Sequence, residues 1–274
     1  MDLNTITEIV KPRGRTELPA WQAGDAWLAG GTWLFSEPQP SLTRLIDIVD
    51  FRWPALQITE QSLQIAATCK IAELDGVTLP SNWTAAPLFN QCCRSFLASF
   101  KIWNMATVGG NLCMALPAGP MISLTAALDG TCTIWTPAGN ERRVTVTDFV
   151  VAPQRNALMP GELLRSIALP LPALRRRTAF RQISLAPLGR SAALLIGTLS
   201  PDDETFALTV TASTPRPVRL SFPGLPTRDA LRERIEAEIQ QYYDDVHGAP
   251  AWRRHMTLQF AEEIRRELAG KGPE

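Results

Sequence analysis

The chain has 274 residues, of which 45% are hydrophobic, so it is long enough to bury one large core or two modest ones. Its 27 basic and 27 acidic side chains cancel, which argues against the basic surface field typical of nucleic-acid binding. The chain opens on a mixed, polar stretch and contains no long apolar run, so neither a signal peptide nor a membrane span is expected.

Cysteine and histidine usage excludes several kinds of site. The five cysteines are an odd number without C-x-x-C spacing, which indicates reduced thiols in a cytoplasmic protein. The same pattern argues against a disulfide framework, a zinc ribbon and an iron–sulfur ligand set. The only histidines, His247 and His255, lie near the C-terminus. A catalytic triad, a histidine metal site or a histidyl–flavin bond in the first half of the chain is therefore not expected.

The first half of the chain predicts short strands separated by turns. Apolar runs indicate strands at 27–29, 42–49 and 62–68. Thr84 is the expected cap of a helix that extends to about residue 98, and a further helix is expected over 121–128. The run between these two helices, 100–116, is expected to be a loop.

Antiparallel β-structure is predicted from residue 131 onward. The turn 137–140 joins strands at 131–136 and 144–149, and further strands are expected at 163–169, 180–184, 191–199 and 206–213. The basic, proline-flanked segment 170–177 is the predicted domain boundary. Two helices close the chain, the first capped by Thr227 and the second ending at Gly270. Their apolar residues recur at every fourth position and are expected to face the core: Leu231, Ile235 and Ile239, then Trp252, Met256, Phe260, Ile264 and Leu268.

The first candidate site is the turn Ala29-Gly30-Gly31-Thr32, which follows the first predicted strand. Paired glycines permit positive φ and let an anion approach the backbone, because no Cβ is in the way. Successive free N–H groups in such a turn form a small anion-binding concavity, to which the Thr32 hydroxyl adds a donor. Taken alone, the motif fits a plain tight turn better than a binding site.

The second candidate site is Thr107-Val108-Gly109-Gly110-Asn111, which combines a hydroxyl, two glycines and an amide side chain. A pyrophosphate carries two charged groups, so two separate donor loops suit a dinucleotide. Neither loop fits G-x-G-x-x-G or G-x-x-x-x-G-K-[ST], which disfavours the Rossmann and P-loop modes. Trp33 and Trp103 flank the loops, and the sequence leaves open whether they pack in the core or line the site.

These motifs, in their order and spacing, resemble the FAD-binding subunit or domain of the molybdenum hydroxylases of carbon monoxide dehydrogenase and xanthine dehydrogenase type. The resemblance covers nearly the whole chain. It is carried by Leu28-Ala29-Gly30-Gly31-Thr32-Trp33-Leu34, Ile65-Ala66-Ala67-Thr68, Ala106-Thr107-Val108-Gly109-Gly110-Asn111-Leu112, Ala126-Ala127-Leu128-Asp129-Gly130, Gly161-Glu162-Leu163-Leu164-Arg165-Ser166-Ile167, Asp245-Val246-His247-Gly248 and Trp252-Arg253-Arg254-His255.

The resemblance implies an α+β fold. A two-subdomain FAD-binding domain, of the PCMH-like type, is followed by a smaller α+β C-terminal domain. The FAD-binding domain is expected over residues 1–172, with subdomains of about 1–55 and 56–172, and the C-terminal domain over 173–274.

The resemblance also implies non-covalent FAD and a set of cofactor-binding residues. The two loops are expected to wrap the FAD pyrophosphate. They contain Leu28, Ala29, Gly30, Gly31, Thr32, Trp33 and Leu34 in the first and Thr107, Val108, Gly109, Gly110 and Asn111 in the second. Leu164 matches a backbone contact near the adenine or the flavin, Arg181 matches a basic residue near the cofactor, and Leu97 matches a position that often lines the site with an aromatic ring. No catalytic residue and no metal ligand are predicted.

Two departures from the family pattern concern the cofactor. An acid that usually follows the loop asparagine and contacts the nucleotide is replaced by Pro120. An Asp-Ile-Ala run that usually lies near the flavin ring is replaced by residues 185–192, which contain no acid. Weaker or differently arranged adenosine binding, and altered access of NAD to the flavin, are therefore open.

For function, the resemblance implies an electron-transfer subunit. A large partner holds the molybdenum cofactor, a small partner holds 2Fe-2S clusters, and the FAD passes electrons to an external acceptor. Two alternatives stay open: a non-catalytic scaffold subunit with weak FAD binding, and an independent FAD oxidoreductase.

Overall fold

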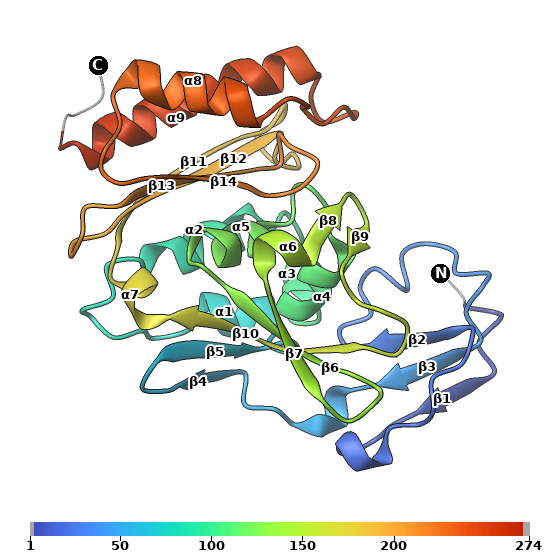
Figure 1. Cartoon of the computed structure of the whole chain (residues 1–274). Coiled ribbons are helices and arrows are strands. Elements are labelled where there is room, and N and C mark those ends of the chain that lie inside the picture. The colour runs from blue at the N-terminus through green and yellow to red at the C-terminus, as the bar shows by residue number, and fades with distance from the viewer. Residues whose placement is uncertain (1–2, 271–274) are drawn as a thin grey trace.

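Helices and sheets alternate in stacked layers in the computed structural model, which describes residues 3–270 (Figure 1). From the top of Figure 1, the layers are the C-terminal helices, a four-stranded sheet, a layer of helices and a five-stranded sheet. A small N-terminal sheet lies beside the five-stranded sheet. The ends of the expected domains, residues 1–2 and 271–274, lie outside the described residues.

The N-terminal sheet positions the first glycine turn. It has the strand order β1-β3-β2, and both outer strands run parallel to β3. The carboxylate of Asp25 is buried and accepts a hydrogen bond from Arg44 Nη2 at 2.7 Å, which lowers the pKa of Asp25 and locks β2 to β3. The elements are β1 (Glu8–Val10), η1 (Arg15–Glu17), β2 (Asp25–Leu28), β3 (Arg44–Asp47) and η2 (Val49–Phe51).

The five-stranded sheet has the order β4-β5-β10-β6-β7 and is antiparallel throughout. Helices cover one of its faces (Figure 1). The strands are β4 (Leu56–Ile58), β5 (Ser62–Ala66), β6 (Thr131–Trp135), β7 (Glu141–Thr145) and β10 (Leu163–Pro170), and a short hairpin pairs β8 (Val150–Ala152) with β9 (Arg155–Asn156). The helices are α1 (Ile71–Asp75), α2 (Pro87–Ser95), α3 (Phe100–Trp103), α4 (Val108–Met114), α5 (Pro120–Ala127), α6 (Val146–Phe149) and α7 (Leu171–Leu174).

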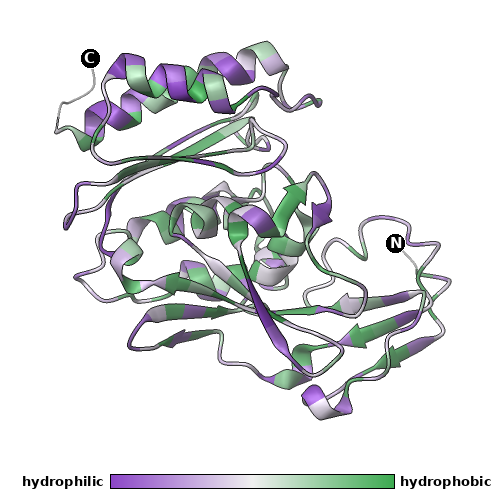
Figure 2. Ribbon diagram, viewed as in Figure 1, coloured by the Kyte–Doolittle hydropathy of each residue, from purple (hydrophilic) through white to green (hydrophobic). Residues whose placement is uncertain are grey.

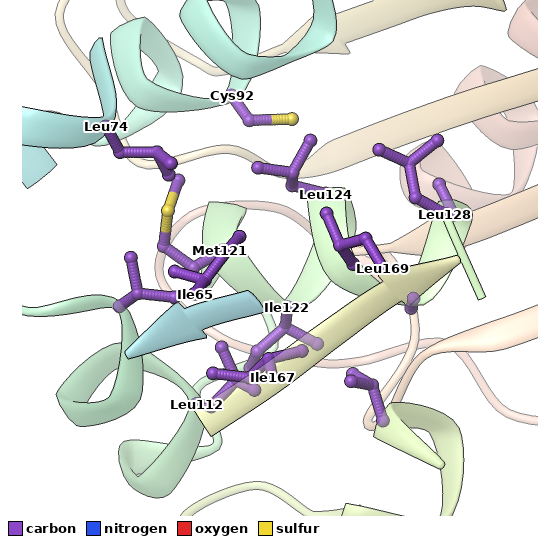
Figure 3. Close-up of a cluster of buried hydrophobic side chains, with 14 of the residues drawn as sticks. Ile65, Leu74, Cys92, Leu112, Met121, Ile122, Leu124, Leu128, Ile167 and Leu169 are labelled. Carbon is purple, nitrogen blue, oxygen red and sulfur yellow. The ribbon is translucent and has the colours of Figure 1, made fainter. Parts of the chain in front are cut away.

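Helix α5 forms the centre of the molecule. Every residue of α5 is buried, because the helix lies between the five-stranded sheet and the four-stranded sheet. Figure 3 shows Met121, Ile122 and Leu124 of α5 among side chains from β5, α4 and β10. This packing fixes the position of α4, which carries the second glycine motif.

The C-terminal part is a four-stranded antiparallel meander covered by two helices. Strands β11 (Arg177–Ile183), β12 (Ala193–Leu199), β13 (Phe206–Thr211) and β14 (Val218–Phe222) follow one another in the sheet, and α8 (Arg228–Glu238) and α9 (Pro250–Leu268) pack on it. Figure 2 shows polar residues on the outward faces of these helices. The predicted stripes pack against the sheet, and Thr227 caps α8 by accepting from the Ala230 N–H.

An aspartate between two arginines joins the two halves of the chain. Asp129 follows α5 with a φ of 54°. Its carboxylate contacts Arg176 Nη1 at 2.6 Å and Arg219 Nη2 at 2.7 Å. Arg176 precedes β11 and Arg219 lies on β14, so this one carboxylate ties the end of α5 to both edges of the C-terminal sheet.

The predicted α+β class is confirmed, with a two-part N-terminal region followed by a smaller sheet-and-helix region. Several local predictions are wrong. Of the strand expected at 144–149, only the first two residues belong to β7, and the rest form helix α6. The run 100–116 contains helices α3 and α4, β14 was not expected, and Thr84 does not cap α2 but donates to the carbonyl oxygens of Arg175 and Arg176. Within residues 3–270, no helix has the length and apolar character needed to cross a membrane.

Candidate functional site

The first glycine loop presents consecutive unpaired amide groups. Among the described residues, the backbone N–H groups from Gly30 to Leu34 have no hydrogen-bond partner, nor does the Thr32 hydroxyl. The loop closes as a single helical turn, in which the Phe35 N–H donates to the Gly31 carbonyl oxygen at 2.9 Å. Free N–H groups at the start of such a turn converge and favour an anion. Residues 29–34 are all half-buried, so the donors are accessible but not fully solvated.

Both glycines of this loop are required by its geometry. A Cβ on Gly30 would lie 2.0 Å from the Met105 carbonyl oxygen, so the backbone of the loop packs directly on the segment before α4. Gly31 has a φ of 69°, which side chains rarely adopt. The sequence prediction of a special backbone at this turn is thus accounted for residue by residue.

The second glycine motif differs from the expected loop. Gly109 and Gly110 lie in the first turn of α4, and Thr107 is its cap. The Val108 N–H donates to the Cys69 carbonyl oxygen, the Gly109 N–H to the Ala67 carbonyl oxygen and the Gly110 N–H to the Thr107 hydroxyl, at 2.9, 2.9 and 3.0 Å. These amides are therefore not free donors, and the expectation that the second motif forms an anion-binding concavity is wrong. The motif instead contributes backbone without side chains.

Asn111 and Pro120 have structural places. The Asn111 side chain accepts a hydrogen bond from the Met121 N–H at 3.1 Å and so caps the start of α5. Pro120 is the buried first residue of that helix, where proline fits because its missing N–H has no intrahelical partner. Position 120 thus carries no polar group for a nucleotide.

A pocket of about 310 Å³ lies where the N-terminal sheet meets α4 and β10. It is within the size range of ligand sites and has a largely apolar lining. The predicted residues Ala29, Gly109, Gly110 and Leu164 meet in it. Its other lining residues, which the sequence did not single out as cofactor contacts, are Trp21, Ala26, Trp27, Ile48, Ala67, Cys113, Asn156, Leu158 and Leu163. Of the tryptophans that flank the two motifs, neither Trp33 nor Trp103 lines this pocket.

Leu97 and Arg181 lie apart from this pocket. Leu97 is 48% exposed in the connection between α2 and α3. Arg181 extends from β11 to α9, where Nε contacts Glu263 and Nη1 contacts Glu267, each at 2.8 Å. Neither of these two predicted residues lines the pocket.

Lys70 lies close to the first glycine loop, a position that the sequence did not reveal. It precedes α1, and its backbone forms an isolated bridge with Thr107 of the second motif. Its Nζ donates to the Met105 carbonyl oxygen at 3.2 Å, the same oxygen on which Gly30 packs. The only signal in the sequence is its position at the end of the segment 65–68 that resembles the family, which by itself assigns no role.

The family model described as "FAD binding domain in molybdopterin dehydrogenase" matches residues 16–172, which contain both glycine motifs and the pocket. The chain belongs to this family. The recognition from sequence is confirmed, and FAD is the cofactor that the family description names.

Two relatives match part of this chain in sequence. Caffeine dehydrogenase subunit beta of Pseudomonas sp. (strain CBB1) is 33% identical over 98 residues, which cover 36% of this chain and 33% of that protein. Xanthine dehydrogenase of Oryza sativa subsp. japonica is 27% identical over 121 residues, which cover 42% of this chain and 9% of that protein. The matched segments thus span a third or less of either relative.

Solved structures share the fold over nearly the whole chain. A chain of reconstituted CO dehydrogenase from Oligotropha carboxidovorans has a TM-score of 0.83 at 20% identity, covering 99% of this chain and 100% of that one. A chain of quinoline 2-oxidoreductase from Pseudomonas putida 86 has a TM-score of 0.78 at 19% identity, covering 98% and 99%. The family fold therefore extends beyond residue 172, through the C-terminal sheet and helices.

Proposed function

We propose that this chain is the FAD-binding electron-transfer subunit of a molybdenum hydroxylase complex, a flavoprotein oxidoreductase. A large partner with the molybdenum cofactor oxidises the substrate and passes the electrons to the 2Fe-2S clusters of a small partner. This chain receives the electrons from those clusters and passes them through FAD to an external acceptor. The observation that carries the proposal is the run of unpaired amides at Gly30–Leu34 beside a pocket lined by Gly109 and Gly110.

The described residues fit an FAD molecule. The amides of the first loop and the Thr32 hydroxyl would hold the diphosphate, because free N–H groups neutralise phosphate oxygens without a counter-charge. Gly110 would let the cofactor approach α4 closely, because no Cβ is in the way, and the apolar walls would bury part of it and exclude water. The other contacts expected from the sequence, among them those of Leu28, Leu97, Leu164 and Arg181, stay predictions. When bound, the flavin ring supplies the redox chemistry.

The partner roles rest on what this chain lacks and on its relatives. Among the described residues, no group of cysteine, histidine or acidic side chains could hold a metal ion. The five cysteines are unpaired, and burial raises the pKa of Cys69, Cys93 and Cys113 to about 12, so these thiols are poor metal ligands. We therefore assign the clusters and the molybdenum cofactor to separate subunits. A location in the cytoplasm is a further part of the proposal. The domain limits 1–172 and 173–274 belong to the same proposal.

Purification of the chain with its genomic neighbours tests this function. The expected result is a flavin absorbance spectrum and a co-purifying large subunit that contains molybdenum. A coloured chain that binds no such subunit would indicate the independent oxidoreductase instead. A colourless chain that does not take up added FAD, but still joins the complex, would indicate the scaffold subunit.

The substitution Gly110→Asp is expected to remove FAD and retain the fold. A Cβ at Gly110 meets only the Thr107 hydroxyl, at 2.9 Å, so the added carboxylate extends into the pocket and repels the diphosphate. We expect the bound flavin to fall at least about 10-fold, measured as flavin absorbance per polypeptide.

Two matched variants control for size and for charge. Gly110→Ala adds the Cβ without the charge, and Gly14→Asp adds the same charge where nothing lies within 4 Å of the new Cβ. Both are expected to keep flavin. Full flavin content in Gly110→Asp would remove the second motif from the site.

A further inference from the structure

Lys70 lies between the two glycine motifs. Its backbone bridges Thr107, the cap of α4, and the next residue, Ile71, donates its N–H to the Ala106 carbonyl oxygen at 3.0 Å. Its ammonium group reaches the Met105 carbonyl oxygen, against which Gly30 packs without a Cβ. The segment 105–107 thus holds Lys70 Nζ next to the first loop, although Lys70 is 40 residues away from Gly30 in the sequence.

The charge of Lys70 is only partly compensated. The side chain is half-buried, and within residues 3–270 it forms no ion pair. The carboxylates of Asp47 and Glu73 face it at longer range and raise its pKa, but desolvation outweighs them and the net shift is downward. A desolvated ammonium with one carbonyl partner has two N–H donors left, and an anion at this position would relieve the imbalance.

The neighbouring donors point to a diphosphate. The unpaired amides of Gly30–Leu34 belong to the loop whose Gly30 packs on the same Met105 carbonyl oxygen as Lys70 Nζ. These amides carry only partial charges, so they leave the two negative charges of a diphosphate unbalanced. A lysine beside a glycine loop supplies the full charge, as a point donor to phosphate oxygens. We propose that Lys70 is the cation that binds the FAD diphosphate, an assignment that rests on the proposed function.

The competing account is that Lys70 only tethers the Met105 carbonyl. The substitution Lys70→Gln separates the two, because an amide side chain can still donate to a carbonyl oxygen but carries no charge. Lys70→Arg keeps the charge. Lys101→Met, on exposed α3, removes a lysine charge elsewhere and is the matched control.

The test titrates the flavin-stripped full-length protein with FAD, ADP and adenosine, and follows binding by calorimetry. For Lys70→Gln we expect FAD and ADP to bind about 10- to 100-fold more weakly, adenosine to bind as in the wild type, and the salt dependence of FAD binding to decrease. Lys70→Arg and Lys101→Met are expected to stay within about 3-fold of the wild type.

The outcomes separate this inference from the proposed function. Wild-type protein that binds neither FAD nor ADP overturns the proposed function. If the wild type binds FAD, and Lys70→Gln binds FAD and ADP as tightly as the wild type does, only the role of Lys70 is overturned. If Lys70→Gln binds both ADP and adenosine more weakly, to the same extent, and the stripped variant unfolds at a lower temperature, Lys70 serves only to hold the Met105 carbonyl. That result also overturns the proposed role of Lys70.

Discussion

Replacing Gly30 with alanine is expected to release the flavin while the rest of the protein stays folded. The new Cβ would lie 2.0 Å from the Met105 carbonyl oxygen and 2.9 Å from its carbon, and backbone atoms cannot move aside as a side-chain end can. The first loop must therefore lift from the segment before α4, which disperses the amide groups of Gly30–Leu34. Overpacking of this kind costs about 1–3 kcal/mol, so we expect FAD to bind about 10- to 100-fold more weakly.

The matched control for this variant is Gly14→Ala. Gly14 belongs to the same part of the chain, has extended backbone that any residue adopts, and has nothing within 4 Å of an added Cβ. Its flavin content, measured by absorbance after gel filtration, is expected to equal that of the wild type. Wild-type FAD affinity in Gly30→Ala would mean that the contact between the first loop and Met105 does not organise the site.

Sequence periodicity was sufficient for the regular elements that are buried on one face. The stripe Leu231, Ile235 and Ile239 follows the helical repeat, and all three residues pack on the C-terminal sheet. The turn at 137–140 was readable from its proline, glycine and asparagine, but the second strand was misplaced, because it begins at Glu141 and residues 146–149 form α6. Such signals are local and predict single elements, whereas the fold class and the order of the domains came from the resemblance to the family.

Local propensity failed at the second glycine motif. Two adjacent glycines disfavour a helix, so the sequence predicted a loop over 100–116. In the structure, α4 packs so closely on β5 that a Cβ on Gly109 would lie 2.5 Å from the Ala67 Cβ and 2.7 Å from its carbonyl oxygen. Tertiary contact therefore outweighs propensity, and Gly109 serves the packing of a helix on a sheet, whereas a Cβ on Gly110 would meet only the Thr107 hydroxyl.

The candidate site was predictable only in part, because its residues come from distant segments. Ala29, Gly109, Gly110 and Leu164 could be named from their motifs, and the structure brings them to one pocket. Trp21, Cys113 and Asn156 line the same pocket but carry no motif. The position of Lys70 depends on a bridge to Thr107, which no periodicity reveals.

The segment Trp252-Arg253-Arg254-His255 was noted in the sequence only as part of the resemblance. It contains Arg253, the arginine whose loss should destabilise the protein most. Arg253 is 1% exposed and donates to the carbonyl oxygens of Gly248, Ala192 and Ala212 and to the carboxylate of Asp245. It thereby fastens the start of α9 to the ends of β12 and β13. Replacing it with methionine takes this donor from the three carbonyl oxygens and leaves the Asp245 carboxylate without its ion pair.

We expect Arg253→Met to lower the free energy of unfolding by about 3–5 kcal/mol, measured by urea denaturation of the purified chain. Arg254→Met is the control: the neighbouring side chain is 51% exposed, and its ion pair with Glu236, at 2.5 Å, is worth at most about 1 kcal/mol.

Because Ala212 also donates its N–H to the Pro117 carbonyl oxygen, just before α5, loss of Arg253 should loosen the C-terminal sheet against the flavin-binding half. Hydrogen exchange at β12 and β13 should then rise more than at β2 and β3. Equal stability of the two methionine variants would show that the Arg253 guanidinium does not stabilise the fold.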